Sequence, residues 1–75
     1  MDLQSFIIGF SEQFEDSDLE SINANTDFKK LKSWDSLTSI LVIGYISTEC
    51  NKNLSKSEID KCITVVDLYN YIFIQ

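Results

Sequence analysis

A serine near the middle of the chain has the neighbours needed to carry a phosphate-linked group. Asp35, Ser36 and Leu37 lie just ahead of an apolar run from Ile40 to Ile46, so we expect a helix to begin at this point. A carboxylate just before the first turn of a helix accepts hydrogen bonds from backbone N–H groups that lack a partner inside it. The Ser36 hydroxyl would then face solvent at the positive end of the helix dipole. A phosphodiester attached there would be electrostatically favoured.

The other residue types exclude or disfavour most other chemistry. The chain has no histidine, which excludes imidazole catalysis and imidazole metal ligands. Cys50 and Cys62 are far apart and lie in no redox or zinc motif, so we interpret both as reduced core residues. There is no glycine-rich phosphate loop, and the chain is too short to enclose a substrate pocket. We therefore expect that the protein is not an enzyme.

Carboxylates at alternate positions from Asp16 to Glu20 resemble the start of a calcium-binding loop. The central glycine and the closing glutamate of such a loop are absent. We interpret this segment as a solvated loop, with weak divalent-cation binding as the alternative, and we expect no dedicated metal site.

The composition indicates one small acidic domain over residues 1–75. A hydrophobic content of 44% is enough for a single compact core in a chain of 75 residues. The formal charge of −6, from six lysines and twelve acids, disfavours nucleic acid and anionic membranes as partners. No apolar run has the length of a membrane span, and the N-terminus has no basic region followed by an apolar one. We expect a cytoplasmic protein without membrane insertion.

Hydrophobic periodicity predicts an all-α fold that starts with two long helices. Apolar residues at helical spacing predict a first helix over residues 3–15. A polar connection follows over residues 16–34, and its apolar residues, Trp34 among them, should pack back on the core. The second helix should start after Asp35 and run to about Asn51.

The C-terminal third of the chain predicts two more helices. Ser55 and Thr64 each precede an acid by three residues, which is the capping-box spacing of a helix start. The first of these helices should be very short. The second should open at Thr64-Val65, and its apolar side should consist of Val65, Leu68, Tyr69, Ile72 and Phe73. Two glycines and no proline disfavour a sheet of tight hairpins. We therefore expect a small four-helix bundle.

Taken together, these features resemble the acyl and peptidyl carrier protein family. Carrier proteins are similarly short and acidic, and they have a first helix, a long loop, a helix that begins at Asp-Ser-Leu, a short third helix and a fourth that opens with Thr-Val. The resemblance covers essentially the whole chain. The matching residues are Trp34-Asp35-Ser36-Leu37, the apolar helix behind them, and the tail Leu54…Ile59…Ile63-Thr64-Val65…Leu68-Tyr69…Tyr71-Ile72.

The resemblance implies that Ser36 carries 4′-phosphopantetheine, which a phosphopantetheinyl transferase would move from coenzyme A. The thiol of this arm would hold an acyl or aminoacyl group as a thioester and present it to the loading and processing enzymes. Tethering would raise the effective concentration of the cargo at each docked active site. Because a carrier must dock and release its partners, we expect a monomer.

The resemblance also implies roles for the neighbours of Ser36. Asp35 would cap the helix and contribute to recognition by the transferase. Leu37 would be the exposed apolar contact that follows the serine. The residues themselves also predict an exposed stripe of Leu37, Leu41 and Tyr45, an apolar patch of the kind that marks a partner site.

Two further apolar residues, Ile40 and Ile59, would flank the entrance for the cargo. Simple core packing is the alternative for both, because an apolar residue at helical spacing is usually a core residue.

The second predicted helix departs from those of familiar fatty-acid carriers, which bear many acids there. Only Glu49 follows Asp35 on this helix. The docking face should therefore be less charged, and partner binding should depend more on apolar contact and less on salt. We infer a dedicated carrier in fatty acid-like, polyketide or other specialised biosynthesis.

A helical interaction module that never receives a prosthetic group is the alternative function. Such a module would use the same apolar stripe for docking, but it would have no use for the Ser36 hydroxyl.

Overall fold

The computed structural model describes residues 1–14 and 21–74. These residues form no β-strand, only an isolated antiparallel bridge between Asp27 and Thr64. The expected all-α class is confirmed for the described residues. The segment from Asp16 to Glu20, which resembles the start of a calcium-binding loop, lies outside them. The elements are, in chain order, α1 (Leu3–Ser11), the 3-10 helix η1 (Phe28–Lys30), α3 (Ser36–Glu49), α4 (Lys56–Asp60) and α5 (Val65–Phe73).

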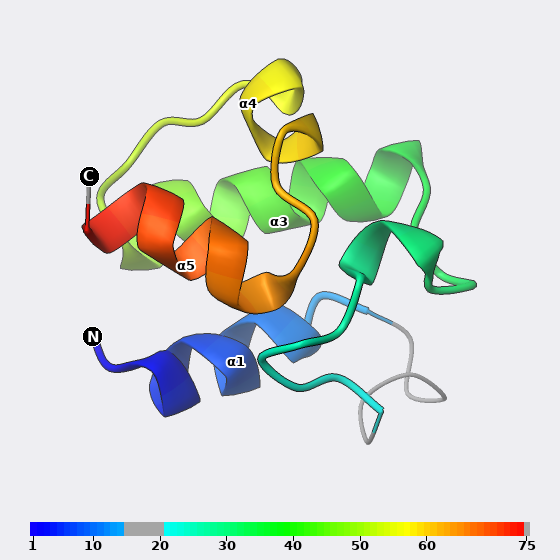
Figure 1. The fold of residues 1–75 in the computed structure, drawn as a ribbon. Helices are drawn as coiled ribbons and strands as arrows, with labels where there is room; N and C mark the ends of the chain where they lie inside the picture. Colours follow the sequence, from blue (N-terminus) through cyan, green and yellow to red (C-terminus); the bar gives the residue numbers. More distant parts are fainter. Residues whose placement is uncertain (15–20, 75) are drawn as a thin grey trace.

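Three of the helices surround one core, with the short α4 on the opposite side of the molecule from α1 (Figure 1). α1 packs against both α3 and α5. The Tyr69 hydroxyl of α5 donates a hydrogen bond of 2.7 Å to the backbone oxygen of Met1. α5 therefore holds the start of the chain in place as well as covering the core.

Every α-helix of the described chain begins at a side chain that accepts a backbone N–H from three residues ahead. Such caps satisfy donors that the first helical turn leaves without partners. The two predicted capping boxes are both present, so these helix starts follow directly from local sequence. The caps are Asp2 for α1, Asp35 for α3, Ser55 with Glu58 for α4, and Thr64 with Asp67 for α5.

The first helix is shorter than its periodicity predicts, since α1 ends at Ser11 rather than near residue 15. Two side chains bond to the last carbonyl groups of the helix: Ser11 Oγ donates to Ile8 O at 2.9 Å, and Gln13 Nε2 donates to Gly9 O at 3.1 Å. Polar side chains that bond to the local backbone in this way favour helix ends. A tight turn then keeps Phe14 on the core side, which is why its spacing resembled a helix.

The second long helix ends one or two residues before the predicted stop. α3 runs to Glu49, with Cys50 as its C-cap. Asn51 follows in the left-handed conformation, with φ of 57°, which asparagine tolerates better than most residues. The asparagine thus ends the helix through its own backbone preference.

A chain of aromatic contacts links α1 to the connection that precedes α3. Ring centroids lie 5.8 Å apart for Phe6 and Phe10, 5.5 Å for Phe10 and Phe28, and 5.2 Å for Phe28 and Trp34. Such pairs add to the free energy gained by burying their apolar area. The prediction that Trp34 holds the connection on the core is confirmed. Phe6, Phe10 and Phe28 are fully buried, as are Val42, Ile46, Ile59, Val65, Leu68 and Ser39.

The connection also bonds to the start of α5 through its backbone. Val65 N–H donates to Thr26 O at 3.2 Å, and Val66 N–H donates to Ala24 O at 2.9 Å. Ile22, near its beginning, is buried. From Ser21 onward, the polar segment is therefore a structured part of the fold that fixes the position of η1.

α1 and α3 approach each other closely where Gly9 faces Tyr45. A Cβ placed on Gly9 would lie 2.5 Å from both Cε1 and Cζ of the Tyr45 ring. Because real atoms do not approach so closely, the absence of a side chain at Gly9 allows this helix contact. Within the residues described, no helix combines the length and the apolar character needed to cross a membrane.

Alanine substitutions at the two glycines should have opposite effects on stability. Alanine in a helix interior is favoured over glycine by roughly 1 kcal/mol. Nothing lies within 4 Å of a Cβ at Gly44, so Gly44→Ala should be stabilising. At Gly9 the same gain is offset by overlap with Tyr45, and overpacking costs about 1–3 kcal/mol. Urea denaturation should therefore show a net loss for Gly9→Ala.

The double-mutant cycle tests the cause of that loss. In a Tyr45→Ala background the ring is gone, and Gly9→Ala should become stabilising, as Gly44→Ala is in the wild type. A loss of similar size in both backgrounds would contradict the proposed contact.

Candidate functional site

Ser36 is the first residue of α3, and the preceding turn fixes its position. Trp34 N–H donates to Leu31 O at 3.0 Å, which closes the turn. The buried Thr38 hydroxyl donates to Ser33 O at 2.7 Å, which joins the turn to the first turn of α3. Because Trp34 contacts the rings of Phe14 and Phe28, the turn that leads into α3 is held against the core.

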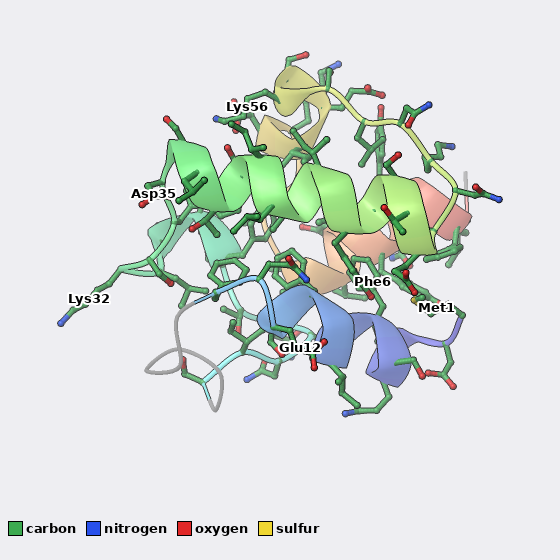
Figure 2. All side chains as sticks on the ribbon, turned by 180° about the vertical axis from the view of Figure 1, so that it is seen from behind. Met1, Phe6, Glu12, Lys32, Asp35 and Lys56 are labelled. Atoms are coloured by element: carbon green, nitrogen blue, oxygen red, sulfur yellow. The ribbon has the colours of Figure 1, made fainter. Side chains whose placement is uncertain are left out.

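Asp35 caps α3 as the sequence predicts. Its Oδ1 accepts the Thr38 N–H at 2.8 Å, and its backbone is extended, as in most N-cap residues. Hydrogen bonds from Thr38 lower the pKa of the Asp35 carboxyl below its usual value. The carboxylate therefore stays ionised at neutral pH, beside Ser36 at the exposed end of the helix (Figure 2).

The Ser36 side chain is exposed. Within the described part of the chain, its hydroxyl has no hydrogen-bond partner, while its backbone oxygen accepts a bond of 2.8 Å from Ser39 Oγ. The hydroxyl is therefore accessible to a modifying enzyme at a helix N-terminus, where backbone N–H groups favour an attached phosphate.

The exposed side of α3 next to Ser36 is apolar. The exposed fractions are 65% for Leu37, 63% for Ile40 and 45% for Leu41. We call these three residues the α3 apolar face. Large apolar side chains that gather on one exposed surface are typical of protein-interaction sites.

Tyr45 departs from the exposed stripe that the sequence analysis expected. It is half-buried against α1, and its hydroxyl donates a long hydrogen bond of 3.4 Å to Phe6 O. Burial, the largest cause, raises the pKa of Tyr45 to about 12. Because Gly9 has no side chain, the Tyr45 ring fits against α1. The role of Tyr45 in partner recognition stays a prediction, and its half-buried ring does not support that role.

The two residues expected at a cargo entrance have different surroundings. Ile40 belongs to the α3 apolar face, whereas Ile59 of α4 has no exposed surface and is part of the core. They do not line a common opening at the surface, and their role as an entrance stays a prediction.

Two side chains that the sequence analysis did not single out hold α4 in place. Tyr71 of α5 donates a hydrogen bond of 2.6 Å to Glu58 Oε2, and this bond is the main cause that lowers the pKa of Glu58. Lys29 of η1 donates a bond of 2.6 Å to Asp60 O. Only the capping role of Glu58 could be read from the sequence, because the other contacts join segments far apart in the chain.

Neither cysteine is poised for chemistry. Cys62 is buried and Cys50 is half-buried, and burial is the main cause that raises the pKa of both thiols. A thiol with a raised pKa forms little of the reactive thiolate. The interpretation as reduced residues agrees with both environments, although Cys50 is not fully in the core.

An open depression of about 360 Å³ lies between the end of α4 and α5. It includes neither Ser36 nor the α3 apolar face. In residues 1–14 and 21–74, no three cysteine or carboxylate side chains lie together as a metal site would need. The depression is lined by Lys61, Cys62, Asp67, Asn70, Tyr71 and Ile74.

Comparison with known proteins identifies no family for this chain. No family model matches it, and no curated protein has significant sequence similarity to it. A function must therefore be argued from the residues of this chain and their surroundings.

Asp35→Asn should remove stability that exists only while the carboxylate is ionised. The folded pKa lies below the unfolded value of about 3.9, so this contribution is full above the unfolded pKa and is lost as the pH falls through the folded pKa. The difference in unfolding free energy between wild type and Asp35→Asn should therefore be largest at neutral pH and shrink in acid. Urea denaturation at a series of pH values measures it.

Glu49→Gln is the matched control, because Glu49 is an acid of the same helix that caps nothing. It lies at the C-terminal end of α3, where a negative charge is unfavourable. Its removal should not destabilise the protein at neutral pH. If both variants lost the same pH-dependent share of the unfolding free energy, the Asp35 cap would not be the source of that stability.

Proposed function

We propose that this protein is an acyl or peptidyl carrier, with Ser36 as the attachment point for 4′-phosphopantetheine. The observation that carries the proposal is the surroundings of Ser36. Its exposed hydroxyl has no hydrogen-bond partner among the described residues and lies at the first position of a capped helix, beside the ionised Asp35 and the α3 apolar face. A plain helix-start serine would not require an exposed apolar face beside it.

The surroundings of Ser36 fit a phosphodiester-linked group. The hydroxyl lies at the N-terminus of a helix of 14 residues, where unpaired backbone N–H groups and the helix dipole favour negative charge. The side chain is exposed, so a long substituent meets no steric barrier there.

The modification is a balanced group transfer. The Ser36 oxygen forms a bond to the phosphorus next to the pantetheine part of coenzyme A, and the pyrophosphate bond of coenzyme A breaks. Adenosine 3′,5′-bisphosphate leaves, and the hydroxyl proton passes to a base of the transferase. When bound, the arm supplies a thiol that holds an acyl or aminoacyl group as a thioester.

The protein's own residues then position the arm and bind partners. Asp35 and Thr38 hold the helix start that carries the attachment point, and the α3 apolar face gives loading and processing enzymes a surface next to it. A tether makes each delivery effectively intramolecular. The element order, with a long connection before α3 and a short α4 before α5, supports a carrier-like bundle. We propose that the protein acts in the cytoplasm as a monomer.

A helical interaction module without a prosthetic group is the second candidate. The exposed Leu37, Ile40 and Leu41 favour it independently, because an apolar docking surface needs no Ser36 hydroxyl.

Modification of Ser36 separates the two functions. The wild-type protein, incubated with coenzyme A, Mg²⁺ and a broad-specificity phosphopantetheinyl transferase, should gain the mass of one phosphopantetheine. Ser36→Ala should gain nothing, because it lacks the attacking oxygen. Intact-protein mass spectrometry measures both.

Ser57→Ala is the matched control, since Ser57 is another exposed serine in the first turn of a capped helix, α4. It should be modified like the wild type. If several transferases leave the folded wild type unmodified, the carrier function is wrong and the interaction module is favoured.

A further inference from the structure

We propose that Thr38 is a positioning residue for the modification of Ser36, because its hydroxyl links the turn before α3 to the helix and so presents the Ser36 oxygen in one orientation. This inference rests on the proposed function. It assigns a part in the transfer reaction to a buried residue that acts only through Ser36. It depends on the acceptors of two buried hydroxyl groups in the first turn of α3.

The two buried hydroxyl groups, those of Thr38 and Ser39, follow directly after the exposed Ser36. Ser39 Oγ donates to Ser36 O at 2.8 Å, which is a bond inside the helix. The Thr38 hydroxyl instead donates to Ser33 O at 2.7 Å, five residues back in the chain and outside the helix. Of these two bonds, only the one from Thr38 joins α3 to the turn that precedes it.

Thr38 holds both ends of the segment that leads into Ser36. Its hydroxyl bonds to Ser33 O, and its backbone N–H donates to Asp35 Oδ1 at 2.8 Å. The ring of Trp34, between these two residues, packs on the aromatic core. The backbone before Ser36 is therefore fixed. The freedom left to the Ser36 oxygen is mainly rotation about the Cα–Cβ bond, among three staggered positions.

The transfer reaction benefits from a fixed attachment point because it requires a defined direction of approach. The Ser36 oxygen must attack the phosphorus roughly in line with the oxygen that leaves. A displacement of about 1 Å from such a geometry can lower a rate by roughly a hundredfold. Loss of the Thr38 hydroxyl frees the turn but removes no exposed group that the transferase would bind. It should therefore lower kcat and change KM little.

Stability alone is the competing explanation for this bond. Without the Thr38 hydroxyl, Ser33 O loses a donor, and a buried carbonyl that loses its donor destabilises a fold. The two explanations predict different kinetics. A less stable protein that is still folded under the assay conditions keeps its kcat, whereas a freed turn lowers kcat even in the folded protein.

Substitution of Thr38 tests the inference. Thr38→Val keeps the shape of the side chain and the N–H that Asp35 accepts, and it removes the hydroxyl. With coenzyme A and a broad-specificity phosphopantetheinyl transferase, this variant should show kcat lowered by about tenfold and KM for the carrier changed by less than about twofold. Thr38→Ser, which keeps the hydroxyl, should retain most of the wild-type kcat. Every variant is assayed at a temperature at which circular dichroism shows it folded.

Two matched controls separate positioning from stability. Ser39→Ala removes the other buried hydroxyl of the same turn. Because the acceptor of that hydroxyl, Ser36 O, also lies in the backbone bonding pattern of the helix, kcat should change much less. Ile46→Val loses stability in the core of the same helix, away from the turn, and it should leave kcat unchanged.

Thr38→Ala is a second variant without the hydroxyl, and it keeps the test available if Thr38→Val does not fold. Its smaller side chain leaves room for a water molecule to bond to Ser33 O, which limits the loss of stability. It should lower kcat in the same direction as Thr38→Val.

The results that would overturn the inference fall into two groups. An unchanged kcat in the variants without the Thr38 hydroxyl, an equal fall in Ile46→Val, or an equal fall in Thr38→Ser would refute the positioning role while leaving Ser36 as an attachment site. No modification of the folded wild type would refute the carrier function itself and this inference with it.

Discussion

The edge-to-face packing of Phe28 and Trp34 in the aromatic core is the contact on which the candidate site depends. These rings join the connection to Phe10 of α1 and so determine where the chain turns into α3. The turn from Leu31 to Asp35 then has little freedom, because Thr38 bonds to it through both its hydroxyl and its N–H group. The position of Ser36 is therefore set by core packing some distance along the chain, and not by the Asp-Ser-Leu motif alone.

Helix starts were the part of this fold that local sequence could predict. A cap acts on backbone groups only three residues ahead, so Asp35, Ser55 and Thr64 could each be read without knowing the tertiary structure. The end of α1 could not be predicted as well. Phe14 continues the apolar spacing, and the side-chain bonds to the last carbonyl groups that accompany the end of the helix become visible only in three dimensions.

Exposure along α3 was predicted in part. Leu37 and Leu41 are exposed as expected, but Tyr45, which falls on the same helical face, turns toward α1. That orientation depends on Gly9, which is distant in sequence and carries no periodic signal of its own. The contacts that hold α4, from Tyr71 and Lys29, were missed for the same reason: hydrogen bonds between distant segments leave no pattern in a single chain.

The contact between Gly9 and Tyr45 also constrains how this sequence can change over time. Because the ring occupies the space where a side chain at position 9 would lie, the two positions are coupled even though they are 36 positions apart in the sequence. A larger residue at position 9 requires a smaller one at position 45, and that second change would open a gap between α1 and α3. Among descendants of this chain, the two positions should therefore vary together, with glycine at position 9 retained wherever an aromatic residue remains at position 45.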